Sequence, residues 1–197
     1  MNWNWKVIGL LALLMAMAWA TAGCQQAGPR YALEIDRSRE ALAAGRTVQG
    51  EYHLRRAREA LGGAEGVGAA DAELLAAEAK LQQGDFDAAL ALAERARRTS
   101  EHPQVLARVR EIEGKVALRQ GDLTGALGHL QWAHDTYEGA EDVARAADLV
   151  ALIRGLQAYA LADVRGARDH WAGIADPAVR SSVETLAANV QSNHQPR

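Results

Sequence analysis

Apolar and polar residues recur with a helical period on both sides of a Gly-Asp pair at positions 84–85. The apolar positions before the pair are Leu74, Leu75, Ala77 or Ala79, and Leu81, and those after it are Phe86, Ala89, Leu90, Ala93 and Ala96. Gly commonly ends a helix in the left-handed conformation, and Asp commonly caps the next helix. The segment is therefore predicted to be an antiparallel helical hairpin.

The same pattern returns 37 residues later. The chain reads "QQGDFDAALALAERAR" at 82–97 and "RQGDLTGALGHLQWAH" at 119–134. Small residues keep the same offsets from the turn in both copies (Ala77, Ala89 and Ala96; Gly114, Ala126 and Ala133). Two further units match less closely (Gly155, "ADV" at 162–164 and Ala167; Ser38, Gly45, Gly50 and Ala57). Helical hairpins repeated at this interval predict a solenoid.

These residues resemble the tetratricopeptide repeat (TPR). The family has a small residue early in the first helix of each hairpin, Gly-Asp-Phe/Tyr at the turn, and Ala twice in the second helix. The resemblance implies an all-α fold, a right-handed α-α superhelix of about three to four TPR-like hairpins, over residues 31–191. The alternative is an irregular helical bundle in which the two turns coincide by chance.

A capping helix is expected at the C-terminal end. Asp176 and Pro177 begin it, and Val179, Val183, Leu186 and Val190 share one face. A solenoid needs such a helix to cover its last apolar surface. An apolar set in the last unit (Leu149, Leu152, Leu156 and Tyr159) is therefore either covered by this helix or a binding patch. Residues 192–197 are expected to be disordered.

In TPR proteins, ligands usually lie in the groove formed by the first helices of the hairpins. Carrying those offsets over gives a partner-binding groove of Arg39, Asp71, Glu78, Gln82, Arg108, Glu111, Lys115 and Arg119. Arg108, Lys115 and Arg119 fall on one helical stripe, with Glu111 placed to pair with Lys115 at i,i+4. This stripe is either a cationic wall for an acidic or C-terminal peptide or an ordinary solvated helix face.

Two further groups of arginines precede predicted helix ends, at 55, 56 and 58 and at 95, 97 and 98. Cations at a helix C-terminus offset the helix dipole, which is the first explanation for them. Contact with an anionic lipid or glycan is the second.

The N-terminus has the layout of a signal peptide over residues 1–23. Lys6 precedes an apolar stretch over positions 7–20, which ends in small residues. The following "ATAGC" resembles the lipobox of bacterial lipoproteins, which implies that Cys24 carries a diacylglycerol and begins the mature chain. Residues 24–30 would then form a short tether. Gln25, in place of Asp, favours the outer membrane, facing the periplasm.

Composition excludes several classes of function. The formal net charge is −3, which gives no support for nucleic-acid binding, and a single cysteine excludes disulfides within the chain. His129 and His134 are five residues apart, about 140° around a helix, so they do not share a metal-binding face. No phosphate-binding loop or Gly-x-Ser-x-Gly motif is present. We therefore expect no catalytic activity, metal, cofactor or small-molecule substrate.

The sequence thus predicts a lipid-anchored periplasmic TPR scaffold that binds a protein partner of the cell envelope. By resemblance, it would be an accessory or assembly factor of an envelope machine, pilotin-like or serving outer-membrane assembly. The alternatives are a structural envelope lipoprotein or spacer without a specific ligand groove and, third, an enzyme acting on peptidoglycan.

Overall fold

The computed structural model describes residues 28–63, 65–139, 143–174, 179–180 and 183–184, and these contain helices and no strand. The helices are α2 (Pro29–Ala43), α3 (Thr47–Leu61), α4 (Val67–Gln83), α5 (Phe86–Thr99), α6 (Pro103–Gln120), α7 (Leu123–Gly139), α8 (Val143–Ala160) and α9 (Val164–Trp171). The all-α class is therefore confirmed. The signal peptide (1–23), Cys24 and the tail (192–197) lie outside the described residues, and the tether (24–30) is described only from residue 28.

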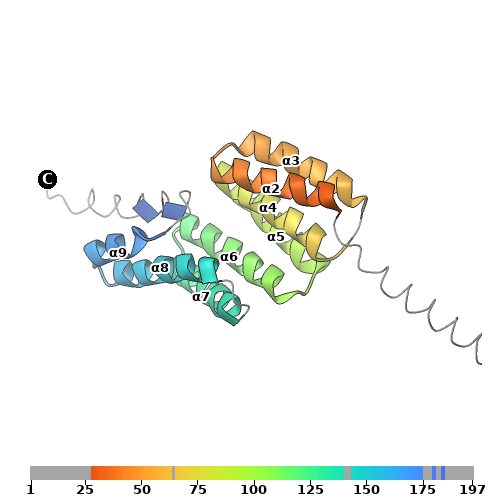
Figure 1. Cartoon of the computed structure of the whole chain (residues 1–197). Helices are drawn as coiled ribbons and strands as arrows, with labels where there is room; N and C mark the ends of the chain where they lie inside the picture. The colour runs from red at the N-terminus through yellow and green to blue at the C-terminus, as the bar shows by residue number, and fades with distance from the viewer. Residues whose placement is uncertain (1–27, 64, 140–142, 175–178, 181–182, 185–197) are drawn as a thin grey trace, which may run out of the picture.

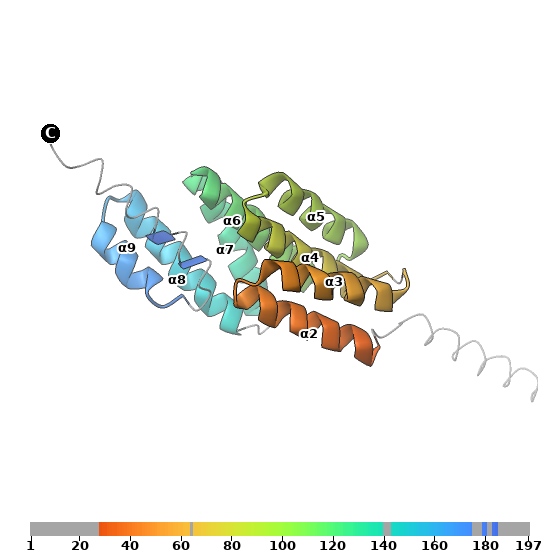
Figure 2. The ribbon, with the colours of Figure 1, turned by 90° about the horizontal axis from the view of Figure 1, so that it is seen from above.

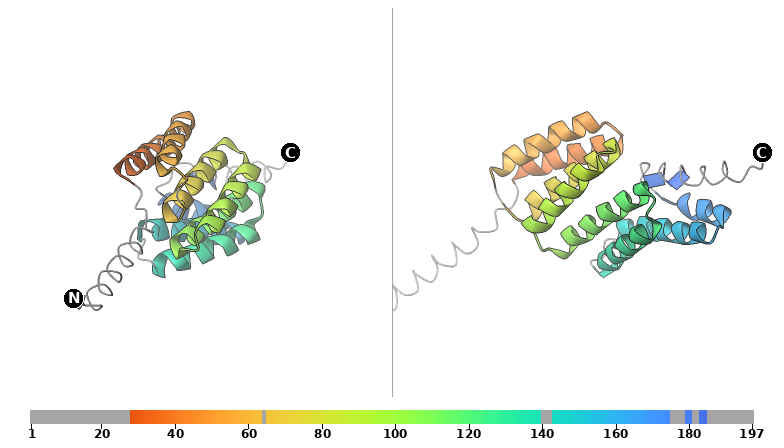
Figure 3. Two further views of the ribbon diagram at one scale, coloured as in Figure 1. Left: turned by 90° about the vertical axis from the view of Figure 1, so that its right-hand side faces the viewer. Right: turned by 180° about the vertical axis from the view of Figure 1, so that it is seen from behind.

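Consecutive helices pack as hairpins in the order of the sequence (Figures 1 and 2). The pairs are α2–α3, α4–α5, α6–α7 and α8–α9; we call the first helix of each pair the A helix and the second the B helix. Each hairpin packs against the next through α3–α4, α5–α6 and α7–α8. The A helices α2, α4 and α6 also contact one another in sequence order. Figure 3 shows α6 between the first two hairpins and the remaining helices.

Two apolar clusters form the core, and α6 contributes to both. Val105, Val109, Ile112 and Val116 of α6 pack into the cluster with α2 to α5. Ala107, Ala117 and Leu118, on another side of the helix, pack into the cluster with α7 to α9. A helix that buries several sides joins the two halves of the molecule through continuous packing.

The four hairpin turns share one backbone geometry. The first or second residue after each A helix is left-handed: Gly45, Gly84, Gly121 and Ala162 have φ values of 70°, 79°, 83° and 63°. The next residue donates its N–H to a carbonyl five positions earlier, at 2.8–3.0 Å, the bond expected of a Schellman helix end. Asp85, Asp122 and Asp163 then cap the B helices by accepting from the backbone N–H three residues on. The predicted turn chemistry is confirmed, including Ala162 in the place of glycine.

The small residues predicted in each unit are buried where helices meet. Ser38, Ala77, Gly114 and Gly155 of the A helices are buried, as are Gly50, Ala89, Ala126 and Ala167 of the B helices. A Cβ atom on Gly114 would lie 2.7 Å from Cγ of Leu130, closer than side chains pack. Ser38 also donates a 3.0 Å hydrogen bond to the carbonyl of Gly50. The weak first unit therefore has the same close helix contact as the others.

The apolar set of the last unit is covered. Leu149, Leu152 and Leu156 are buried in one cluster with Val179 and Val183, and Tyr159 packs against that cluster half-buried. Residues 179–180 and 183–184 are helical. This confirms burial over an exposed binding patch for these leucines. Leu186 and Val190 of the expected capping helix lie outside the described residues.

Candidate functional site

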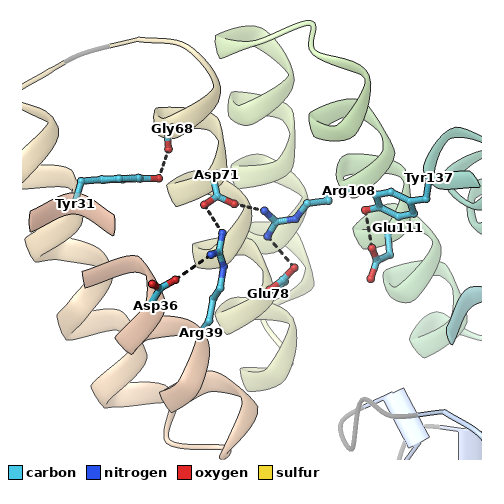
Figure 4. Close-up of polar contacts among 9 residues, drawn as sticks. All are labelled: Tyr31, Asp36, Arg39, Gly68, Asp71, Glu78, Arg108, Glu111 and Tyr137. Atoms are coloured by element: carbon cyan, nitrogen blue, oxygen red, sulfur yellow. Dashed lines mark hydrogen bonds and ion pairs between the residues drawn. The ribbon is translucent and has the colours of Figure 1, made fainter. Parts of the chain in front are cut away.

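Ion pairs join three A helices on the face predicted to bind a partner (Figure 4). Arg39 of α2 places Nη2 2.8 Å from Oδ2 of Asp71 in α4. Arg108 of α6 contacts the other carboxylate oxygen of Asp71, and its Nη2 lies 3.1 Å from Oε1 of Glu78. We call Arg39, Asp71, Glu78 and Arg108 the A-helix network. It links α2, α4 and α6 directly.

Helical spacing explains why these side chains meet. Asp71 and Glu78 are seven residues apart, so they lie two turns apart on one face of α4. Because α4 packs between α2 and α6, arginines from both sides reach that face. The side chain of Arg108 is only 12% exposed, whereas that of Arg39 is 50% exposed. The network is therefore partly buried on the α6 side and open to solvent on the α2 side.

Tyr31 extends this set of contacts toward the start of α4. Its hydroxyl donates a 2.6 Å hydrogen bond to the carbonyl of Gly68. Burial, and then the negative charge of Asp71, raise the pKa of Tyr31 well above its usual value. The hydroxyl therefore remains a protonated donor that fixes the N-terminal ends of α2 and α4 side by side.

Glu111 faces the interior of the second half of the molecule. It is 7% exposed, and one carboxylate oxygen accepts a 2.9 Å hydrogen bond from the hydroxyl of Tyr137 in α7. Lys115 lies 2.7 Å from the other oxygen, so the predicted i,i+4 pair is confirmed. Glu111 therefore joins α6 to α7, a contact that the sequence pattern did not indicate.

The two remaining predicted groove residues lie near the ends of their helices. Gln82 of α4 donates a 3.3 Å hydrogen bond to the carbonyl of Leu42. Arg119 of α6 is exposed and makes no ion pair with a described residue. Among the predicted groove cations, Arg39 and Arg119 are thus the two most open to solvent.

Two of the three cations of the predicted stripe, Arg108 and Lys115, are paired with carboxylates of the chain. Asp71 and Glu78 neutralise Arg108, and Glu111 neutralises Lys115. The carboxylates that pair with Arg108 come from α4, about thirty to forty residues earlier in the sequence, so the stripe by itself does not reveal them.

A second polar cluster, between α2 and α3, was not predicted. Glu34 is 3% exposed, and His53 Nδ1 lies 2.7 Å from its carboxylate, with Arg56 Nε at 3.3 Å. The hydrogen bond from His53, aided by the charge of Arg56, lowers the pKa of Glu34 against the opposing effect of burial. The buried carboxylate therefore stays ionised and holds the first hairpin together.

The remaining histidines singled out in the sequence have local partners. His129 lies 3.2 Å from Glu113, and His134 lies 3.1 Å from Asp135. Within the part of the chain that the structure describes, no three His, Cys, Asp or Glu side chains gather as a metal site. None of the described helices has the length and apolar character needed to cross a bilayer.

Comparison with protein-family models, curated proteins and solved structures finds no match to this chain.

Proposed function

We propose that the protein is a lipid-anchored, TPR-like scaffold that holds a segment of a protein partner against its A helices. The hairpins would form a right-handed α-α superhelix of four TPR-like units closed by the C-terminal helix. One observation carries this proposal: four successive hairpins repeat the same turn and the same buried small residues, and α4 contacts both α2 and α6. Such an array offers a long, rigid wall to an extended or helical segment.

The chemistry of the wall favours a partner segment of mixed polarity with a carboxylate. Asp71, Glu78 and Arg108 hold each other in fixed positions, so the wall needs little reordering on binding. Arg39 and Arg119 remain accessible to an acidic side chain or C-terminal carboxylate. The proposed partner is a protein of the cell envelope. A role as an accessory factor in envelope assembly fits the proposed location at the outer membrane.

Affinity capture from an envelope extract tests the wall. The tagged protein is compared with Arg39→Glu/Arg119→Glu, which reverses the two accessible cations of the wall. Arg46→Glu/Arg165→Glu is the matched control, because both residues are exposed and belong to a hairpin turn and a B helix. We expect the same proteins to be captured by the original chain and the control, and to be lost with the wall variant. Equal capture by all three would overturn the wall as the docking surface.

The proposed anchor is tested separately. Cys24→Ser should leave an uncleaved precursor without lipid, whereas the original chain is shortened and labelled by a radioactive fatty acid. Localisation at the outer membrane, facing the periplasm, is checked by membrane fractionation and by protease access to opened cells. A serine variant that is processed and membrane-bound like the original would contradict lipidation.

The second candidate is a structural spacer without a specific ligand. Ion pairs within the wall favour this candidate, because Arg108 and Lys115 both pair with carboxylates of the same chain. The capture experiment separates the two functions, because a spacer enriches no protein in an Arg39- and Arg119-dependent way.

A further inference from the structure

A pocket of about 520 Å³ lies between the B helices α3 and α5, away from the wall described above. Arg55 and Arg58 of α3, Lys80 of α4, and Arg95 and Arg98 of α5 line it. In each B helix the two arginines are three residues apart, so both lie on the helix face that borders the pocket. We call this site the arginine pocket.

The arginine pocket keeps a positive excess after its internal pairs are counted. Of the residues that line it, Glu51 alone is acidic. Lys80 lies 2.7 Å from Glu51 and, as a hydrogen-bond donor, lowers its pKa, so this carboxylate is ionised. Glu73, beside the pocket, accepts from both Arg58 and Arg95 at 2.9 Å. Glu94, also beside the pocket, lies 3.7 Å from Arg98. Five cations against these three carboxylates leave two positive charges in excess.

The arginines are accessible to a ligand. The exposed fractions of Arg58, Arg95 and Arg98 are 40%, 54% and 67%. Arg55 is exposed and makes no ion pair with a described residue. A guanidinium has five N–H donors, and Glu73 uses only one nitrogen of each arginine that it meets. Several donors therefore remain for a multivalent oxyanion, and arginines match phosphate oxygens well.

The floor of the pocket is apolar. Leu54, Ala76 and Leu92 are the buried apolar residues of its lining, Ala88 is half-buried and Ala91 is exposed. A charged rim over an apolar floor fits an anion that carries a hydrophobic group, and it fits a fully polar anion less well. An acidic peptide would pair with the charged side chains of the rim but would offer no apolar group to contact the floor.

The arginines lie at the end of the molecule where the chain enters α2. Tyr31, near the start of α2, contacts Gly68, near the start of α4, and Arg58 and Arg95 both reach Glu73 one turn further along α4. The turn at Gly45 is at the opposite end of the same hairpin. A chain tethered through the residues before Pro29 would therefore present these arginines toward its anchor.

We propose that the arginine pocket binds the phosphate and adjoining glycerol of an anionic phospholipid in the membrane that anchors the chain. This inference rests on the proposed lipid anchor for its choice of a lipid over a soluble phosphate. Binding would hold the scaffold in one orientation, with α3 and α5 at the bilayer surface and the A-helix wall available to a partner.

Thermal unfolding of the purified full-length protein, in one uncharged detergent throughout, tests the pocket. The probes are dihexanoylphosphatidylglycerol, dihexanoylphosphatidylcholine, inorganic phosphate and a glutamate-rich peptide. A ligand that binds only the folded chain raises Tm, by roughly 5–10 °C at about 100 times its Kd for a protein of this size. We expect this rise with phosphatidylglycerol, and a much smaller one with phosphatidylcholine or phosphate at the same concentration.

Two double variants test whether phosphatidylglycerol binds in the arginine pocket. Arg55→Gln/Arg95→Gln removes two pocket cations and leaves Glu73 paired with Arg58, so the fold is preserved. Arg46→Gln/Arg97→Gln removes the same charge outside the pocket lining. The phosphatidylglycerol shift should fall at least threefold in the first variant and stay unchanged in the second. Equal shifts in both variants would overturn the pocket as the site.

The remaining outcomes separate the possible ligands. An equal shift with inorganic phosphate would replace the lipid by a free oxyanion, and a shift with a glutamate-rich peptide but not with phosphatidylglycerol would make the pocket a protein-docking surface. Either result overturns the lipid proposal. Because the lipid probes are short-chain and soluble, the result does not depend on acylation of Cys24, so failure of the anchor and failure of the pocket are distinguishable.

Discussion

Gly155 of α8 lies against the indole ring of Trp171 in α9, so closely that a Cβ atom on Gly155 would overlap the indole Nε1. Trp171 is 2% exposed and is among the largest buried side chains of the described residues. Its Nε1 also points to the carbonyl of Leu152 at 3.4 Å. The last hairpin therefore depends on the absence of a side chain at position 155.

Gly155→Ala should destabilise the protein by roughly 1–3 kcal/mol. Alanine is intrinsically favoured over glycine in a helix by about 1 kcal/mol, but its Cβ would overlap a buried ring, and such overpacking costs more than this gain. Gly128→Ala in α7 is the matched control, because a Cβ there has no atom within 4 Å. The free energy of unfolding of the Gly128→Ala control should rise by up to about 1 kcal/mol. Chemical denaturation measures both, and a stabilised Gly155→Ala would contradict the close packing.

Ala162→Gly should stabilise the protein. Ala162 has φ of 63° in the turn between α8 and α9, a conformation that costs an alanine about 1–2 kcal/mol relative to glycine. The added freedom of glycine in the unfolded chain cancels about 0.4–1 kcal/mol of this, so a net gain of about 0.5–1 kcal/mol is expected. Ala158→Gly, inside α8, should instead lose about 1 kcal/mol. A lower Tm for Ala162→Gly would be inconsistent with the observed turn.

Arg108→Met should cost roughly 1–3 kcal/mol of unfolding free energy. The change leaves the carboxylates of Asp71 and Glu78 partly buried without the cation that joins them. Arg119→Met, on the same helix but exposed, should stay within about 0.5 kcal/mol of the original chain. Similar losses in the two variants, measured by urea denaturation, would argue against a structural role of the A-helix network.

Glu34 should contribute stability that is lost in acid. Its pKa is lower in the folded protein than the ordinary glutamate value of about 4.3, because His53 and Arg56 favour the charged form. The contribution is therefore present above that value and disappears as the pH falls through the folded pKa. The Tm difference between the original chain and Glu34→Gln should be largest near pH 7 and shrink below about pH 4.

Glu40→Gln, on the same helix, is the control for this pH experiment. Glu40 is exposed and makes no ion pair with a described residue. Its Tm difference from the original chain should be small at every pH. A Glu34→Gln difference that stays constant from pH 7 to pH 3 would rule out the ionised cluster as its cause.

Local features of the fold could be predicted from the sequence because their causes are local. A Gly-Asp pair between two apolar stripes specifies a left-handed helix end and an N-cap, and the structure has both at Gly84-Asp85 and Gly121-Asp122. Burial of Leu149, Leu152 and Leu156 was one of the two alternatives that the pattern left open, because an apolar stripe at the end of a helical array is either covered or a binding patch.

The candidate site could be predicted only as positions, without its electrostatics. Sequence offsets placed Asp71, Glu78 and Arg108 on A helices, but not in contact with one another. Whether Arg108 presents a positive charge depends on which face of α4 turns toward α6, and this is fixed by packing between hairpins. The arginine pocket was missed for the same reason. Compensation of the helix dipole is a sufficient local explanation for the arginines at the end of α3 and for those at the end of α5. Only packing on α4 brings the two groups together.

By itself, then, the sequence determined the helices, their turns and the close helix contacts, because these depend on backbone conformation and side-chain size within about forty residues. Apart from the i,i+4 pair of Glu111 and Lys115, the tertiary structure decided which charges cancel and which accumulate. An ion pair forms only where packing brings two side chains within a few ångströms, and that distance is set by helices far apart in the chain.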